Sequence, residues 1–179
     1  GMNLYAGMKK AFDLGATHVI ELHGDSQYDF TYVKEMKQNF SQGCDLVLGN
    51  RFFNFKEPLV NGMPIYIYLG NIFLTILGNI GLGIKNDDLF QGFRGYSKNL
   101  FNKINTNNYN KDYRFSYEII AQSYYSDFKI ASVHTTCDYQ GDHTTMPLTL
   151  DIPCILHALK IGLHFSLAKC VVQCSIFKL

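Results

Sequence analysis

The chain has 179 residues, of which 47% are hydrophobic and 17% charged, and its formal net charge is +1. This length and composition fit one globular domain with a sizeable core, and the near-neutral charge argues against a nucleic-acid partner held by bulk electrostatics. The five cysteines show no Cys-x-x-Cys spacing, so we expect free thiols in a reducing compartment rather than a disulfide framework.

The first fifty residues predict alternating helices and strands. Apolar residues at helical spacing predict helices over 3–14 and 30–42, each followed by a glycine that favours a helix end. Short apolar runs over 17–22 and 45–48 predict strands. Strand, helix and strand joined by short turns are typical of crossover connections, so we expect an α/β fold with a mostly parallel sheet.

The rest of the chain is more apolar. Residues 63–84 have the length of a membrane-spanning helix, but Asn71, Asn79 and four glycines favour a core or interfacial helix. A polar, glycine-containing loop is expected over 86–96, a helix over 114–126 and a strand over 129–137. Residues 150–179 predict an apolar helical tail with interspersed lysines, which is a candidate for contact with a membrane.

Two polar clusters follow the first two predicted strands. Asp25 and Gln27 are two residues apart just after the first strand, so their side chains point the same way, and their oxygens suit a hard divalent cation that also binds phosphate. Arg51 follows the second strand. In a parallel sheet its guanidinium would lie beside the first cluster, where it could pair with phosphate.

Two more clusters lie further along the chain. Asp87 and Asp88 precede Gly92-Phe93-Arg94, a pattern that could supply a general base and a positioned cation. The polar loop 139–145, which contains His143, could close over a substrate. Each cluster alone is common among solvated loop residues, and only their order and spacing favour a shared site.

That order resembles the family 2 glycosyltransferases with the GT-A fold, especially the dolichol-phosphate mannosyltransferase-like branch and the polyprenyl-phosphate glycosyltransferases. Five stretches carry the resemblance, which covers roughly residues 1–146: Gly7-Met8-Lys9-Lys10-Ala11, His23-Gly24-Asp25-Ser26-Gln27-Tyr28-Asp29, Gly49-Asn50-Arg51-Phe52, Asp88-Leu89-Phe90-Gln91-Gly92-Phe93-Arg94-Gly95-Tyr96 and Phe115-Ser116-Tyr117-Glu118-Ile119.

The resemblance implies a metal-dependent transfer of a sugar from a nucleotide-diphosphate sugar to an acceptor, with polyprenyl phosphate as a candidate acceptor. Asp25 and Gln27 would hold Mg²⁺ or Mn²⁺ on the diphosphate. Asp25, Arg51, Arg94 and His143 would contact the nucleotide sugar or its phosphates, and Asp88 would be the catalytic base near the acceptor. The expected location is the cytoplasm, at the inner face of the membrane.

The chain also departs from the family pattern. His23 stands where the metal motif usually has its first Asp, and His143 is the only basic residue of the 139–145 loop. The N-terminal strand motif V-x-I-P-x-Y-N-E and the D-D-x-S-x-D segment, which bind the nucleoside in the family, are missing. Residues 1–149 therefore resemble the C-terminal part of a GT-A catalytic domain that lacks its nucleoside-binding strands, followed by the 150–179 tail.

Two other readings bear on the function. A non-catalytic remnant of such a domain, acting only as a binding or structural fragment, stays open as the alternative. A sugar nucleotidyltransferase would need a Gly-x-Gly-Thr-Arg start, which this sequence lacks. The donor sugar, the base, the acceptor and the oligomeric state are not determined by these motifs.

Overall fold

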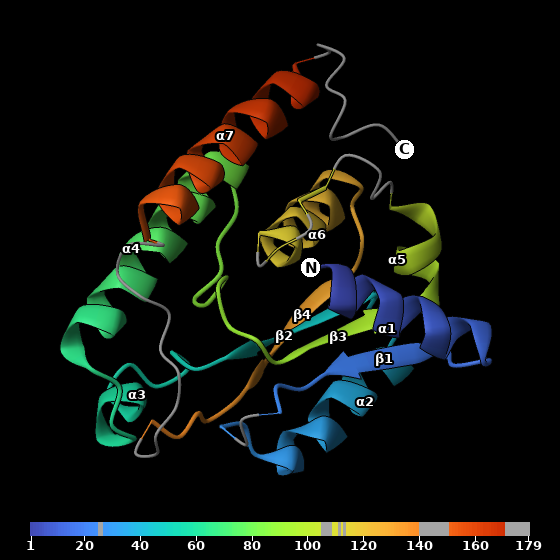
Figure 1. Ribbon diagram of the computed structural model, residues 1–179, viewed down its shortest axis with the longest axis horizontal. Coiled ribbons are helices and arrows are strands. Elements are labelled where there is room, and N and C mark those ends of the chain that lie inside the picture. The colour runs from blue at the N-terminus through green and yellow to red at the C-terminus, as the bar shows by residue number, and fades with distance from the viewer. Residues whose placement is uncertain (25–26, 105–108, 111, 113, 140–150, 171–179) are drawn as a thin grey trace.

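The computed structural model describes residues 1–24, 27–104, 109–110, 112, 114–139 and 151–170. These residues form a mixed α/β fold in which helices flank a small four-stranded sheet (Figure 1). The elements in chain order are α1 (Met2–Asp13), β1 (His18–Glu21), the 3₁₀ turn η1 (Phe30–Tyr32), α2 (Val33–Ser41), β2 (Leu46–Asn50), α3 (Glu57–Val60), α4 (Ile65–Leu82), β3 (Arg94–Ser97), α5 (Lys98–Lys103), α6 (Phe115–Tyr125), β4 (Ile130–His134) and α7 (Asp151–Lys169).

The sheet is mixed, which corrects the prediction of a mostly parallel one. Its strand order is β1-β3-β2-β4, and β3 runs antiparallel to both β1 and β2, whereas β2 and β4 are parallel. The strand β3 begins within the segment 86–96 that we predicted as a loop and ends one residue after it. Because β3 separates β1 from β2, the two strands expected to be neighbours do not pair.

The inner strands β2 and β3 of the sheet are buried on both faces. Leu46 and Leu48 point into one core cluster together with residues of α1, α6 and α7, while Val47 points into a second cluster under α2. This alternation is what the two-residue period of a strand requires when helices cover both faces. A fully buried β2 explains why 45–48 reads as a continuous apolar run.

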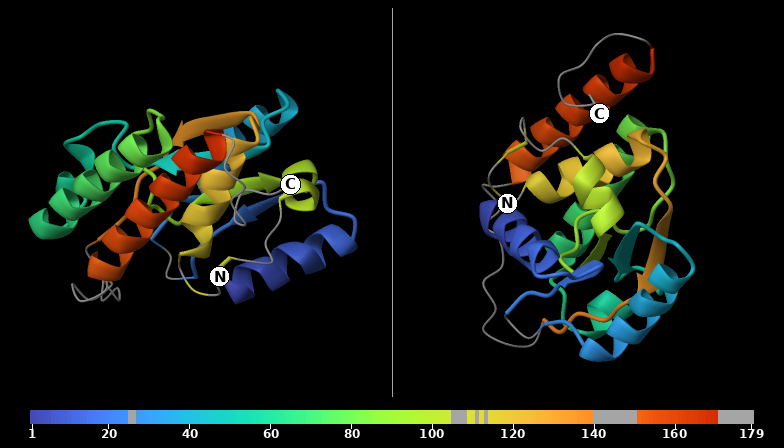
Figure 2. Two further views of the ribbon diagram at one scale, coloured as in Figure 1. Left: turned by 90° about the horizontal axis from the view of Figure 1, so that it is seen from above. Right: turned by 90° about the vertical axis from the view of Figure 1, so that its right-hand side faces the viewer.

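Helices α4 and α7 lie side by side and extend away from the sheet (Figures 1 and 2). Their backbones come close at Gly81 and Gly162, where a Cβ added to Gly162 would lie 2.7 Å from the Cα of Gly81. By length and composition, α4 is the one helix of the described residues that could cross a membrane. The predicted tail is helical over Asp151–Lys169, where Ala158, Ile161 and Phe165 join the larger core cluster.

The predicted helices agree with α1, α2, α4 and α6 to within a few residues, and the 129–137 strand contains β4. The expected helix over 30–42 begins as η1, where the Asp29 carboxylate accepts a hydrogen bond from the Thr31 N–H, and continues as α2. Two short helices, α3 and α5, were not predicted. Their four and six residues are too few to show a helical repeat.

Candidate functional site

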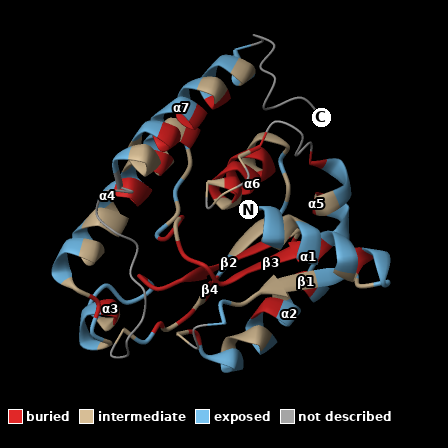
Figure 3. Ribbon diagram, in the orientation of Figure 1, coloured by how far each residue is buried: buried red, intermediate tan, exposed pale blue. Residues whose placement is uncertain are grey.

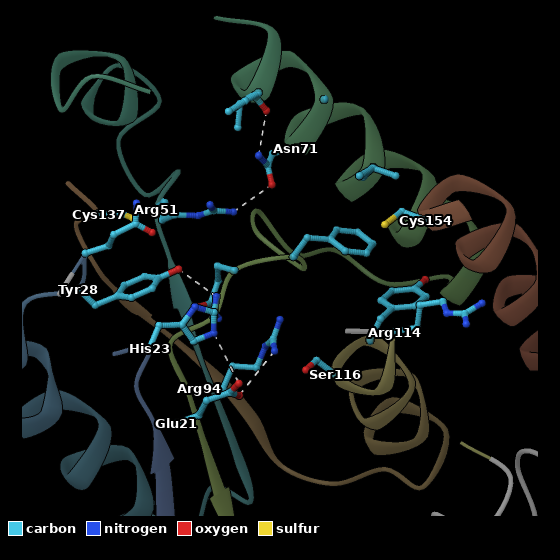
Figure 4. A pocket seen from close by; sticks show the side chains of 18 of the residues that line it. Glu21, His23, Tyr28, Arg51, Asn71, Arg94, Arg114, Ser116, Cys137 and Cys154 are labelled. Atoms are coloured by element: carbon cyan, nitrogen blue, oxygen red, sulfur yellow. Dashed lines mark hydrogen bonds and ion pairs between the residues drawn. The ribbon is translucent and has the colours of Figure 1, made fainter. Parts of the chain in front are cut away.

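A cavity of about 530 Å³ lies between the strand ends of the sheet, α4 and the starts of α6 and α7 (Figure 4). The sequence contains three arginines, Arg51, Arg94 and Arg114, and all three line this cavity. In Figure 4, Arg51 and Arg94 lie on the side of the strand ends, and Arg114 lies across the cavity at the start of α6. The volume is within the usual range for small-molecule sites.

The antiparallel β3 brings Arg94 to this site. Because β3 runs against its neighbours, its first residue lies at the edge of the sheet where β1 and β2 end. Arg94 is accordingly in register with Glu21, the last residue of β1, and with Leu48 of β2. A parallel strand would have put its first residue at the opposite edge.

Glu21, whose side chain is only 13% exposed, is the centre of a charged cluster at the cavity wall. One carboxylate oxygen accepts a 2.7 Å hydrogen bond from the Tyr96 hydroxyl and lies 3.7 Å from Arg94 Nη1, and the other lies 3.7 Å from His23 Nε2. Burial by itself raises the pKa of Glu21, but hydrogen bonding to His23 and the charge of Arg94 outweigh it, so the pKa is lowered. The carboxylate is therefore held in its charged form.

His23 is held against the backbone of the Gly92-Phe93-Arg94 segment. A Cβ on Gly92 would overlap the His23 imidazole, so a larger residue at this position would displace that ring. The Gly92 N–H donates a 3.0 Å hydrogen bond to the hydroxyl of Tyr28, whose pKa burial raises to about 12. The predicted metal-motif segment and the predicted Gly-Phe-Arg turn thus meet, although 64 residues separate Tyr28 from Gly92.

Asp88 holds Arg51. The Arg51 guanidinium donates from Nε to Asp88 Oδ2 at 2.7 Å and from Nη2 to Asp88 Oδ1 at 2.9 Å, and the Arg51 backbone N–H donates to Oδ2 at 3.1 Å. Asp88 has no exposed surface and is not among the cavity-lining residues. Burial by itself lowers the pKa of Arg51, but the Asp88 charge more than compensates and raises the pKa well above its usual value.

The remaining donors of Arg51 connect three parts of the molecule. Arg51 Nη1 donates to the Tyr139 hydroxyl at 3.0 Å, and Nη2 donates to Asn71 Oδ1 of α4 at 3.1 Å. Tyr139 follows β4, and its backbone N–H donates to the carbonyl of Asn61. The end of β2, helix α4 and the segment after β4 therefore meet at one guanidinium.

The far side of the cavity is formed by α6 and α7. Ser116 and Tyr117 lie in the first turn of α6, and Cys154 and His157 lie on α7. His157 Nε2 is 3.3 Å from Oε1 of the buried Glu118, which also accepts a 2.7 Å hydrogen bond from the Asn110 N–H. The buried His157 and Glu118 side chains therefore bring α7 and α6 into contact at the cavity wall.

Four side chains that line the cavity carry buried polar atoms with no hydrogen-bond partner: Gln91 Nε2, Arg94 Nε, the Tyr117 hydroxyl and His157 Nε2. Each of these groups can donate a hydrogen bond, and unpaired buried donors are uncommon in folded proteins. A ligand rich in acceptor oxygens would satisfy them.

The predicted metal site is only partly within the described residues. Gln27 lines the cavity, whereas Asp25 lies outside the described part of the chain. Among the residues that the structure describes, no group of three or more His, Cys, Asp or Glu could hold a metal ion. Glu21, the lining carboxylate, is engaged by Tyr96 and faces Arg94, so the described residues do not by themselves form a Mg²⁺ or Mn²⁺ site.

Of the predicted site residues, Gln27, Arg51 and Arg94 line one cavity, and Asp88 lies behind Arg51. Asp25 and His143 lie outside the described residues. Tyr139, the first residue of the predicted 139–145 loop, also lines the cavity. The sequence reasoning missed Glu21 and Asn71 as members of the site. Glu21 could have been found, because a carboxylate that ends an apolar strand run is a recognisable signal, but Asn71 lies within the apolar 63–84 segment and carries none.

Comparison of the sequence with models of known protein families and with curated proteins finds no match. The likeness to the family 2 glycosyltransferases therefore depends on the sequence motifs alone.

Proposed function

We propose that this chain is the C-terminal part of a GT-A-like domain, and that its cavity binds a nucleotide-diphosphate sugar for transfer of the sugar to an acceptor. The observation that carries the proposal is the convergence of all three arginines of the chain on one cavity that also presents the unpartnered buried donors Gln91 Nε2 and Arg94 Nε. Arginine pairs with phosphate through two parallel hydrogen bonds, and a diphosphate supplies many acceptor oxygens.

The order of the motifs supports the same class of ligand. The segment around Gln27, the end of β2 at Arg51 and the start of β3 at Arg94 come together at one edge of the sheet, as expected if they contact one substrate. Asp25 and Gln27 would hold Mg²⁺ or Mn²⁺, which when bound neutralises charge on the leaving diphosphate. Arg51 and Arg94 would orient the phosphates and oppose the negative charge that develops there.

In the reaction, an acceptor oxygen forms a bond to C1 of the sugar. The bond from C1 to the diphosphate oxygen breaks, and the nucleoside diphosphate leaves with the electron pair. A hydroxyl acceptor must also lose its proton to a base, whereas a phosphate monoester such as polyprenyl phosphate is already anionic. Because both oxygens of Asp88 accept hydrogen bonds from Arg51, the geometry favours Asp88 as a positioning residue and suits an anionic acceptor.

The hydrogen bonds from Arg51 to both Asp88 oxygens also favour one alternative function, which is binding without sugar transfer. A domain whose candidate base is fully engaged by Arg51 could bind a nucleotide diphosphate without transferring a sugar, as a non-catalytic remnant would. Binding and transfer must therefore be measured separately.

The test is isothermal calorimetry of UDP and GDP on the 179-residue chain, with and without Mn²⁺. We expect metal-dependent binding of one nucleotide. We expect Asp25→Ala and Gln27→Ala to weaken it, and Gln42→Ala, an exposed substitution beyond the end of α2, to leave it unchanged. Binding that is absent with both nucleotides, or equal in all four proteins, would overturn the proposal. Binding without release of nucleoside diphosphate in the presence of a sugar donor and polyprenyl phosphate would support the binding-only alternative.

A further inference from the structure

Helices α4 and α7 share an outward surface that is apolar along its whole length. Of the exposed large apolar side chains among the described residues, all but Met2, Leu14 and Phe30 lie between residues 53 and 80 or on α7 (Figure 3). The apolar face consists of two stripes at three- and four-residue spacing: Ile65, Leu69, Phe73, Ile76 and Ile80 of α4, and Ile152, Leu156, Leu159, Leu163 and Leu167 of α7.

These stripes are not core surfaces of the domain. Each of their side chains is at least 40% exposed, while the opposite sides of the same helices are buried through Leu74 and Leu82 of α4 and Ile161 and Phe165 of α7. Soluble monomers rarely expose contiguous apolar patches larger than a few hundred Å². The apolar face therefore requires a partner.

The polar side chains of α4 do not interrupt the face. The helix contains no Asp, Glu, Lys, Arg or His over its 18 residues. Asn71 accepts from Arg51 and donates to the Ile67 carbonyl, and Asn79 exchanges two hydrogen bonds with the backbone of Asn86. The close approach of Gly81 and Gly162 lets the backbones of α4 and α7 pack directly against each other on the inner side of the face.

We propose that the apolar face docks on the surface of a lipid bilayer, with α4 and α7 lying in the interface. Charge favours lipid as the occupant. Lys160 and Lys169 are exposed on α7, and after Asp151 that helix carries no acidic residue, which suits anionic headgroups. A two-fold pairing with a second copy would instead bring the lysines of both copies toward one another.

The helices lie on the bilayer rather than span it, because their inner sides are occupied. Leu82 of α4 and Ile161 of α7 belong to the core cluster that includes β2, so lipid cannot surround either helix. Tyr66, Gly70 and Asn71 of α4 and Cys154 of α7 also line the cavity. Docking therefore brings the cavity next to the bilayer, but the docking itself does not depend on the proposed sugar transfer.

The test uses the absence of tryptophan from the chain. Phe73→Trp places a single fluorescent reporter in the apolar face, and Phe30→Trp places one at another exposed site outside it. With phosphatidylcholine–phosphatidylserine vesicles we expect a blue shift for Phe73→Trp and quenching by brominated lipid, and neither for Phe30→Trp. A reporter at Phe73 that stays in water, or equal quenching at both sites, overturns the proposal.

Flotation of the full chain with the same vesicles gives a second measurement. We expect Phe73→Gln and Leu163→Gln each to lower the partition coefficient about tenfold or more, since each removes one buried side chain from lipid, and Phe30→Gln to leave it unchanged. All three changes are at exposed positions, so circular dichroism should match the wild type. If the wild type remains with neither neutral nor anionic vesicles and instead sediments as a dimer that Phe73→Gln dissociates, the occupant is a second copy and the proposal is wrong.

Discussion

The two sides of α4 present opposite kinds of chemistry. Inward, the helix meets the cavity, where Arg51 and Arg94 are buried and face the carboxylates of Asp88 and the partly buried Glu21. Outward, the apolar face carries neither charges nor polar partners, yet it is exposed. Charged side chains thus face the interior and apolar side chains are exposed, which is the reverse of the usual distribution. This reversal indicates that each of the two surfaces binds a ligand or a partner.

We expect the largest change in stability when the buried ion pair of the charged side is disrupted. Asp88→Ala leaves the buried Arg51 guanidinium without its carboxylate, so we expect the free energy of unfolding to fall by about 3–5 kcal/mol in urea titrations. Asp13→Ala removes a carboxylate from the exposed Lys9–Asp13 pair and should cause no measurable change. Equal effects of the two substitutions would contradict the buried pair.

The second prediction concerns the contact between α4 and α7 on the apolar side of the molecule. Gly162→Leu places a side chain where Gly81 lies 2.7 Å from the new Cβ, so we expect a loss of about 1–3 kcal/mol of stability in urea unfolding. Gly70→Ala is the matched control, since its Cβ would meet nothing within 4 Å and alanine favours the helix by about 0.5–1 kcal/mol. A Gly162→Leu protein as stable as the wild type would mean that the helices do not pack closely.

The link between the two sides is Asn71. Asn71→Ala removes the acceptor for Arg51 Nη2, and we expect a loss of about 1 kcal/mol, because a hydrogen bond to a charged group is lost while alanine improves the helix. Asn39→Ala is the control, because the Asn39 side-chain amide donates to the Glu35 carbonyl within the same helix α2. If both variants unfold at the same urea concentration, the Arg51–Asn71 contact does not stabilise the domain.

The smallest effect is a pH dependence confined to the charged side. The lowered pKa of Glu21 means that its contribution to stability is fully present above the ordinary value of 4.5 and is lost as the pH falls through the lower folded-state pKa. Glu21→Gln should therefore reduce stability at pH 7 and flatten the decline between pH 5 and 3. Urea midpoints measured across this range check the prediction, and parallel curves for the two proteins would refute it.

The site could be predicted in part. Gln27, Arg51 and Arg94 were identified from short motifs, and they do line one cavity. The position of Arg94 opposite Glu21 could not be predicted, because it depends on an antiparallel strand of four residues, Arg-Gly-Tyr-Ser, which shows no apolar alternation. The engagement of both Asp88 oxygens by Arg51 likewise joins residues 37 positions apart.

The sequence by itself determined the α/β class, the main helices and the residues that carry charge at the strand ends, because apolar periodicity and turn residues act over a few neighbours. Only the tertiary structure decided the strand order, the pairing of Arg51 with Asp88 and the side of α4 that faces outward. A helix that is apolar all round has no preferred side in its own sequence. Its orientation is set by distant residues, here Arg51, which binds Asn71, and Gly162, which packs against Gly81.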